Sequence, residues 1–197
     1  AWYHLVVCVD SGQSTAADRI KAWLNNVQIE TWSQSNFPSQ NQDMYINGNY
    51  MQKFGIGAAS FGSSYLRYWD GYISELHYLD GQAKTPSDFA GEDAVTGQWK
   101  PIEYTGTYGN NGGYWKLDSA TLDSTFTDAS VTYKSLYFDG TNDYVQSEVP
   151  LQGGTNNAFS LSWWIMFNEF NGGQIYSQYP NASATGRFTA ATNSGAV

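Results

Sequence analysis

The opening run of the chain, residues 1–9 with the sequence AWYHLVVCV, is apolar on both of the faces that a β-strand would present. Successive side chains of a strand point to opposite faces, so a run of this kind is covered on both sides, as a central strand is. At the edge of a sheet, its unpaired backbone groups would be exposed. We therefore predict that other parts of the chain supply a strand on each side of residues 1–9.

The rest of the chain has the pattern of an antiparallel β-protein. Short runs rich in Val, Ile, Tyr, Phe and Trp are separated by clusters of Gly, Asn, Asp and Ser, and helical periodicity is nearly absent. Hydrophobic residues make up 41% of the 197 residues, which is enough for a sizeable core. Beyond the opening run we expect strands at residues 19–24, 27–32, 43–47, 53–57, 69–81, 135–138, 144–145, 159–167 and 174–179.

Local signals add detail to this pattern. Asn25 and Asn26 tolerate positive φ, which predicts a two-residue hairpin turn at this point. Thr85 and Pro86 are typical of a helix start and predict a single helical turn at residues 85–89. In the strand at residues 69–81, side chains alternate between the two faces of the sheet. One face is predicted to carry Ile73, Glu75, His77 and Leu79, and the other Tyr72, Ser74, Leu76 and Tyr78.

Charge and cysteine content exclude several classes of function. The net charge is −9 and the nine Lys and Arg are scattered, so neither nucleic acid nor an anionic membrane surface is an expected partner. No apolar run is long enough to cross a membrane. Cys8 is the only cysteine, which excludes an internal disulfide and a cysteine-based zinc site. A chain that opens on a core strand without an initiator Met is expected to be processed or excised.

Several segments together carry a resemblance to a known family. Residues 2–7 (WYHLVV), Val27 and residues 71–76 (GYISEL) resemble the carboxyl-terminal half of the laminin-G and concanavalin A-like sandwiches, which include pentraxins, lectins and glucanases. A more specific likeness, to such domains in large structural proteins of marine bacteriophages, is carried by residues 71–81, 85–89 and 97–106. The resemblance implies an all-β fold, an antiparallel two-sheet jelly-roll β-sandwich.

The two halves of this family stand in permuted order. Residues 136–145 (LYFDGTNDYV) and 159–164 (FSLSWW) resemble the opening strands of the family. The closing half therefore comes first, at residues 1–118, and the opening half last, at residues 134–197, with a linker at residues 119–133. This order is compatible with a circular permutation, with a fragment of two tandem domains, or with strand exchange between chains. We favour exchange, in which residues 134–197 complete the sandwich of a neighbouring chain, and expect self-association.

Glycan binding is one function that the resemblance implies. Sugars stack on aromatic rings, and their hydroxyl groups form hydrogen bonds with Asn, Gln and Asp; this chain has such residues in or beside predicted loops. Most aromatic residues of a sandwich are core residues, which is the competing explanation for each of them. The candidate glycan-binding residues are Tyr65, Tyr68, Trp69, Tyr104, Tyr108 and Asn110.

Calcium is the metal that the resemblance implies, and calcium binds carboxylate and carbonyl oxygens of loops. The oxygen-rich turns of this chain are residues 139–143 and the pair Asp70-Gly71. The same residues are also fully explained as turn formers, because Asp, Asn and Gly cap turns and adopt positive φ. The candidate calcium ligands are Asp70, Asp139, Asn142 and Asp143.

These observations predict a non-enzymatic structural or adhesive module, in a virion, a fibre or an extracellular filament, that contacts surface glycans. Its location would be extracellular or on a virion. Two alternatives stay open, a stand-alone carbohydrate-binding lectin module and a glycoside hydrolase of the concanavalin A-like class. Retaining hydrolysis needs two carboxyl groups about 5 Å apart, and Glu75 has only Ile73 and His77 as neighbours on its predicted face. The remaining candidate for an acid/base couple is Glu75 with His77. A structural hydrogen bond explains this pair better than a catalytic role does.

Overall fold

The computed structural model describes residues 1–32, 36–42, 54–61, 64–110, 112–117, 130–132, 135–146, 158–168, 173–178 and 188–191. This part of the chain consists of antiparallel strands and two short 3-10 helices, η1 (Ala16–Arg19) and η2 (Pro86–Asp88), so the prediction of an all-β protein is confirmed. No helix among these residues has the length and apolar character needed to cross a membrane. The strand expected at residues 43–47 and most of the predicted linker lie outside the described residues.

The largest sheet has eight strands and contains both halves of the chain. Its order is β11 (Ser130–Thr132), β12 (Ser135–Asp139), β7 (Asp70–Asp80), β14 (Ala158–Phe167), β1 (Tyr3–Asp10), β2 (Ile20–Leu24) and β3 (Val27–Gln28), and β10 (Gly113–Trp115) also pairs with β7.

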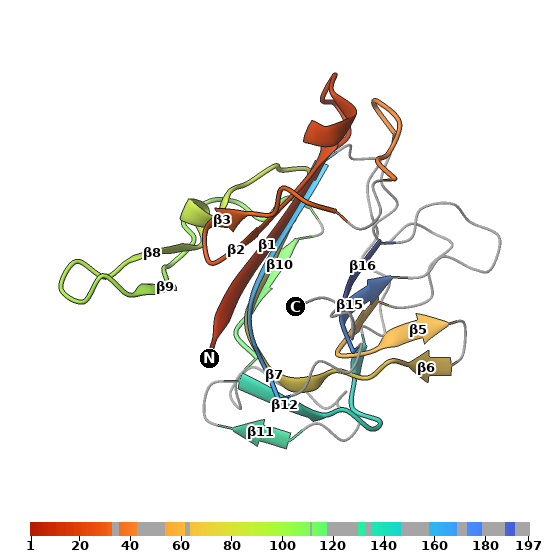
Figure 1. Cartoon of the computed structure of the whole chain (residues 1–197), viewed down its shortest axis with the longest axis vertical. Helices are drawn as coiled ribbons and strands as arrows, with labels where there is room; N and C mark the ends of the chain where they lie inside the picture. Colours follow the sequence, from red (N-terminus) through yellow and green to blue (C-terminus); the bar gives the residue numbers. More distant parts are fainter. Residues whose placement is uncertain are drawn as a thin grey trace.

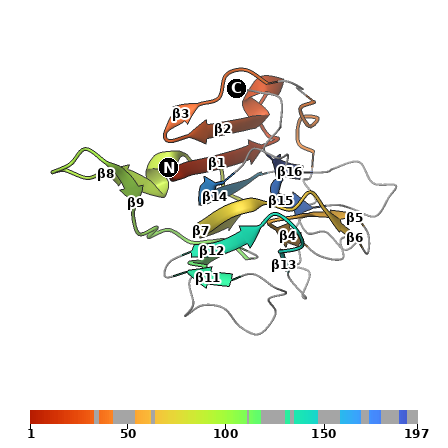
Figure 2. The same cartoon turned by 60° about the horizontal axis from the view of Figure 1, so that its bottom comes forward.

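A second sheet packs against one face of the large sheet (Figure 1). Ile56 and Ile175 of the second sheet share one apolar core with Phe138, Leu161 and Trp163 of the large sheet. The second sheet has the order β13 (Val145–Gln146), β4 (Phe54–Ile56), β15 (Gln174–Gln178) and β16 (Phe188–Ala191). Two separate hairpins are formed by β5 (Ala59–Phe61) with β6 (Ser64–Leu66) and by β8 (Ala90–Glu92) with β9 (Trp99–Pro101). Figure 2 shows the β8–β9 hairpin on the opposite side of the large sheet from β15 and β16.

Strand β14 lies between β1 and β7, which belong to the other half of the chain. It pairs with the whole of β1, from Tyr3 opposite Ile165 to Asp10 opposite Ala158, and with most of β7. On its other side β1 pairs with β2. Residues 1–9 therefore contain a central strand with a neighbour on each side, as their two apolar faces predict, and both neighbours belong to the same chain.

Both local predictions are confirmed. Asn25 and Asn26 have φ of 48° and 67° and connect β2 to β3 in a tight hairpin. The expected helical turn at residues 85–89 is η2, where the backbone N–H of Thr85 donates to the carboxylate of Asp88 at 2.9 Å.

A β-bulge in β7 makes the predicted division of its faces wrong. His77 lies opposite Ser162, and Ser74 lies opposite Trp164. A shift of three residues along β7 is therefore matched by a shift of only two residues along β14. The extra residue lies next to Glu75, whose φ of 52° is in the left-handed region. The bulge shifts the alternation by one residue. Residues predicted to share a face with Ile73 therefore lie on the opposite face of the sheet. Ile73 shares the main core with Leu76 and Tyr78, whereas Leu79 belongs to a second apolar cluster with Val6 and Phe89.

This second cluster lies under residues 82–110, which we call the covering segment because they lie on the outer face of the large sheet. Phe89 of the covering segment is 1% exposed and packs on Val6 and Leu79. Ser160 of β14 fixes the start of the segment, since its hydroxyl donates to the carbonyl of Gln82 and accepts the N–H of Lys84, both at 2.8 Å. One face of the large sheet is thus buried by the second sheet and the other, in part, by the covering segment.

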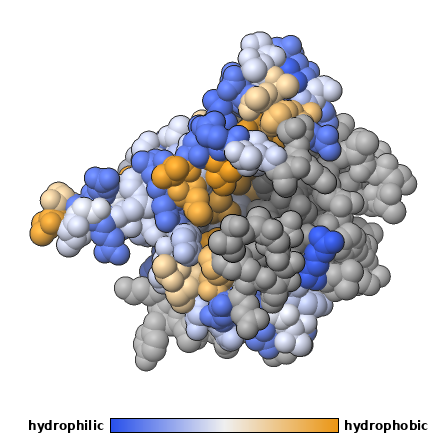
Figure 3. Space-filling model, viewed as in Figure 1, coloured by the Kyte–Doolittle hydropathy of each residue, from blue (hydrophilic) through white to orange (hydrophobic). Residues whose placement is uncertain are grey.

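Exposed apolar side chains gather at two places on the face shown in Figure 3. One is the β2–β3 hairpin, where Leu24 and Val27 are exposed. The other is the end of the projecting β8–β9 hairpin, where Val95 is 93% exposed. That end is held by the carboxylate of Asp93, which accepts the N–H groups of Val95 and Thr96 at 2.9 Å each.

We expect Gly57→Ala to lower the free energy of unfolding by about 2 to 4 kcal/mol, from backbone strain together with overpacking. Gly57 follows β4 with φ of 81°, and a Cβ atom there would lie 2.3 Å from Cε1 of Phe138 on the large sheet. The matched control is Gly97→Ala, because Gly97 has φ of 66° with no atom within 4 Å of its added Cβ, and strain alone costs about 1 kcal/mol. Urea unfolding of the three proteins tests this. Equal losses in the two variants would contradict the close packing of the two sheets.

Candidate functional site

The densest group of chemically active side chains lies where β10 pairs with the bulged part of β7. Tyr114 of β10 lies directly opposite His77, and their rings stack with centroids 4.5 Å apart. The hydroxyl of Tyr114 donates to Oε2 of Glu75 at 2.5 Å. Tyr114 nevertheless keeps 41% of its surface exposed. The ring is thus presented to solvent while its orientation is fixed at two points.

The bulge explains how Glu75 reaches this group. In the left-handed conformation of Glu75, its backbone N–H donates to the carbonyl of Lys116 at 3.2 Å, just beyond β10. A non-glycine residue in this region costs about 1 to 2 kcal/mol, so the surrounding pairing must hold it there. The consequence is that the Glu75 carboxylate and the His77 ring both contact Tyr114.

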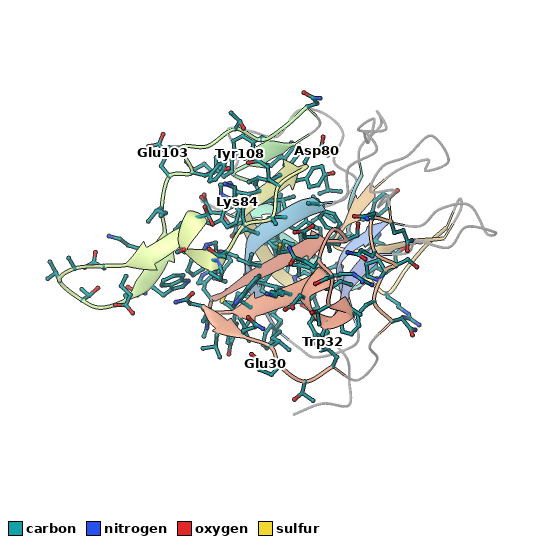
Figure 4. All side chains as sticks on the ribbon, turned by 90° about the horizontal axis from the view of Figure 1, so that it is seen from above. Glu30, Trp32, Asp80, Lys84, Glu103 and Tyr108 are labelled. Carbon is teal, nitrogen blue, oxygen red and sulfur yellow. The ribbon has the colours of Figure 1, made fainter. Side chains whose placement is uncertain are left out.

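Two tyrosines of the covering segment extend this group. The hydroxyl of Tyr108 lies 3.2 Å from Nδ1 of His77, and the two rings are nearly parallel. Tyr104 meets Tyr108 edge to face, with centroids 5.2 Å apart, and also packs on Phe89. We call Tyr104, Tyr108 and Tyr114, with Glu75 and His77, the tyrosine surface. Figure 4 shows Tyr108 with Glu103 and Lys84 on one flank of the large sheet.

Burial sets the protonation of this surface. It lowers the pKa of His77 from 6.5 to about 4, so the imidazole is neutral at pH 7. Burial also raises the pKa of Tyr108, and the neighbouring Tyr104, Glu103 and Glu75 raise it further. At neutral pH the Tyr108 hydroxyl is therefore protonated and able to donate or accept a hydrogen bond.

The six predicted glycan-binding residues do not form one site. Tyr104 and Tyr108 lie together in the tyrosine surface, and the exposed Asn110 follows two residues later. Tyr68 is half-buried just before β7, whereas the backbone of Tyr108 bonds to Asp80 at the end of β7. An eleven-residue strand is about 35 Å long, which separates the two groups.

The remaining two predicted residues behave differently. Trp69 does lie in the loop directly before β7, as predicted, but its side chain is 1% exposed in the main core, where a sugar ring has no access. The large apolar indole gains more from burial against Phe167 and its neighbours than from contact with a ligand. Tyr65 lies in β6, and its side chain is outside the described residues.

Sequence reasoning missed Tyr114. The Gly- and Asn-rich composition of residues 104–114 predicts a loop or a hairpin, whereas Gly112 and Gly113 let β10 approach β7 closely. A Cβ atom on Gly112 would lie 2.5 Å from the carbonyl oxygen of Tyr78. The sequence signal that could have identified a strand is the adjacent pair Tyr114 and Trp115, because aromatic residues are enriched in strands.

The four candidate calcium ligands include three carboxylates that the fold brings together. Asp70 and Asp139 are cross-strand partners on β7 and β12, although the sequence places them in separate turns. Asp143 is buried, and its Oδ2 accepts the backbone N–H of Asp139 at 2.8 Å. Asp139 in turn accepts the N–H of Thr141 at 2.8 Å, and Asn142 is an exposed residue of the same turn.

These contacts are those of turn formers. Asp70 is also engaged, because its Oδ1 accepts the side-chain amide of Asn168 at 2.8 Å. Within the described ranges, no group of three or more His, Cys, Asp or Glu side chains has a geometry suited to a metal ion.

A second polar cluster lies beneath the covering segment, with His4 and Ser162 buried and Trp99 half-buried. Nδ1 of His4 accepts the indole N–H of Trp99 at 3.1 Å, and Nε2 of His4 lies 2.8 Å from Oγ of Ser162. Since an indole nitrogen can only donate, the His4 proton is on Nε2 and points at Ser162. Burial, and then the charge of His77, lower the pKa of His4 to about 4. This tautomer cannot accept a proton from Ser162, so the pair is not a nucleophile with its general base.

No family model matches this chain, and neither a curated protein nor a solved structure shows significant similarity to it. The resemblance to laminin-G and concanavalin A-like domains therefore stays a prediction.

The two buried histidines should make the protein sensitive to mild acid. Both have an ordinary pKa of 6.5 and a pKa of about 4 in the fold, so folding favours their neutral forms. The stability that this contributes is complete above pH 6.5 and is lost as the pH falls towards 4. We expect the free energy of unfolding to fall by about 2 kcal/mol per histidine between pH 7 and pH 5.

Urea unfolding across this pH range measures the effect. His77→Gln should remove about half of the slope, whatever its effect on absolute stability. A free energy of unfolding that does not change between pH 7 and pH 5 would contradict the neutral, buried state of both rings.

The left-handed conformation of Glu75 gives a further prediction. Both Glu75→Gly and Glu75→Ala remove the carboxylate, but only glycine adopts positive φ without steric cost. We expect the glycine variant to be more stable than the alanine variant by about 1 kcal/mol in thermal unfolding. At Glu92, an exposed residue of β8, we expect the alanine variant to be more stable than the glycine variant. If alanine is the more stable residue at both positions, position 75 is not strained.

Proposed function

We propose that this chain is a non-enzymatic adhesive module that contacts surface glycans through its tyrosine surface. The observation that carries the proposal is that Tyr114 is exposed and yet fixed, by stacking on His77 and by the hydrogen bond to Glu75. An exposed aromatic ring of defined orientation offers an apolar face to the C–H groups of a pyranose. Because the ring is already held, binding does not have to restrict its side-chain rotation.

Hydrogen-bonding groups surround this ring. The Glu75 carboxylate has about four acceptor positions, and Tyr114 uses one of them. The hydroxyl of Tyr108 lies in the same ring cluster, and the exposed Asn110 follows Tyr108 by two residues on the covering segment. Such donors and acceptors around an apolar face match the alternating C–H and O–H groups of a sugar.

The geometry supports binding over hydrolysis. His77 is 5% exposed beneath the Tyr114 ring, which keeps its nitrogens away from a substrate held on the surface. Among the described residues, Glu75 is the carboxylate that accepts the hydrogen bond of Tyr114, whereas glycoside hydrolysis uses two carboxyl groups across one bond. We therefore assign Glu75 to ligand contact and to positioning of Tyr114.

Beyond this surface, we propose a structural role in a virion, a fibre or an extracellular filament, with the laminin-G-like jelly roll that the sequence resembles. Two antiparallel sheets around one core support this fold. Self-association by strand exchange stays a prediction: β14 from the second half fills the gap between β1 and β7 of its own chain, and exchange would place the same strand in a neighbouring chain. Calcium stays a prediction for Asp70, Asp139 and Asp143.

We expect Tyr114→Ala to weaken glycan binding by about tenfold or more, which corresponds to the ~1.5 kcal/mol of a good aromatic contact. Co-sedimentation of the chain with insoluble neutral polysaccharides, such as cellulose, chitin and xylan, provides the measurement. The matched control is Trp2→Ala, since Trp2 is 39% exposed and contacts Tyr72 at the other end of β7. Binding that is lost in the control and retained in Tyr114→Ala, or a wild-type chain that binds no polysaccharide, would contradict the proposal.

A further inference from the structure

The tyrosine surface carries negative charge at its rim. Glu75 bonds to the hydroxyl of Tyr114, and the exposed Glu103 directly precedes Tyr104 in the covering segment. Burial raises the pKa of Tyr108 most, and Tyr104 and then the carboxylates of Glu103 and Glu75 raise it further, so both carboxylates lie near its hydroxyl. A ligand at this surface therefore meets a negative potential.

Two lysines lie near this surface, and one of them is also close to a carboxylate of the covering segment. Nζ of Lys84 lies 5.8 Å from the centroid of the Tyr104 ring, but it is also 3.9 Å from Oδ1 of Asp88. Lys116 follows Tyr114 by two residues and is exposed, and its carbonyl accepts the N–H of Glu75. The net charge of −9 adds to the local effect, because it opposes the approach of polyanions from a distance.

Tyrosine ring faces also attract cations. The π-electrons of a ring favour a positive group above its face, by about 0.5 to 1 kcal/mol at exposed sites. An exposed carboxylate paired with an ammonium group adds up to about 1 kcal/mol. At Tyr114 an exposed ring lies beside a half-buried carboxylate, since the ring and Glu75 are joined by one hydrogen bond.

We infer that the tyrosine surface prefers a sugar that carries a protonated amine over neutral sugars and over sugars that carry carboxylate or sulfate groups. This inference rests on the proposed glycan-binding function and names the class of glycan. The pyranose ring would stack on Tyr114 while its ammonium group is bound by Glu75. Glu103 provides a second carboxylate at the rim of the same surface.

Calorimetric titration with defined oligosaccharides at pH 6, where glucosamine is largely protonated, tests the preference. The probes are hexamers of glucosamine, N-acetylglucosamine and glucose, an oligomer of a uronic acid, and trilysine as an amine without sugar rings. We expect the glucosamine hexamer to bind about tenfold more tightly than the two neutral hexamers, with the uronic acid oligomer weakest.

Variants that remove single charges test which carboxylates cause the preference for the glucosamine hexamer. Glu75→Gln should reduce the preference to about two- to threefold, whereas Glu92→Gln removes the same charge from the distant β8–β9 hairpin and should leave the preference unchanged. Glu103→Gln is a second test at an exposed position, where folding is not at risk, and should also reduce the preference. Melting temperatures of all variants at pH 6 verify that the proteins are folded.

The outcomes separate the inference from the proposed function. Equal binding of the glucosamine and neutral hexamers would overturn the inference and leave the glycan-binding function intact. Binding of none of the sugars would overturn both. Trilysine binding as strong as that of the glucosamine hexamer, or a preference that Glu92→Gln reduces as much as Glu75→Gln, would show general charge attraction and overturn the inference.

Discussion

The fold depends on the pairing of β14 with β1 on one side and β7 on the other. β14 presents Leu161, Trp163 and Ile165 to the main core, where the second sheet packs. Its opposite face presents Ser160 and Ser162, which bind the covering segment and His4. One strand thus joins the two halves of the chain and positions both layers that cover the sheet. The positions of the covering segment and of the tyrosine surface on the outer face depend on this pairing.

The bulge at Glu75 is the second determinant, because it decides which side chains of β7 face outward. Before the bulge Ile73 faces the main core, and after it His77 and Leu79 lie beneath the covering segment. A strained backbone at one residue therefore places a neutral imidazole under Tyr114 and a carboxylate at its hydroxyl. Strain of this kind at a group of polar and aromatic side chains is typical of sites that bind ligands.

Sequence reasoning predicted what local pattern determines. The apolar faces of residues 1–9, the Asn25-Asn26 turn and the helical turn after Thr85 each follow from residue types at fixed spacing. The approach of Asp70 to Asp139, and the burial of Trp69, depend on pairing between residues far apart in the chain, which periodicity does not report. Tyr114 was missed for the same reason, because its role arises only when β10 lies against the bulge, and no spacing in the sequence marks a bulge.

The central place of β14 also determines the order in which the chain can fold during synthesis. β1 is complete at residue 10 and β7 at residue 80, but the strand that separates them begins only at residue 158. Until that point leaves the ribosome, two apolar strands have unpaired edges, a state in which nascent chains are prone to aggregate. Long sequence separation between pairing strands also slows folding. The edges of β1 and β7 that β14 covers therefore stay exposed until β14 has been made.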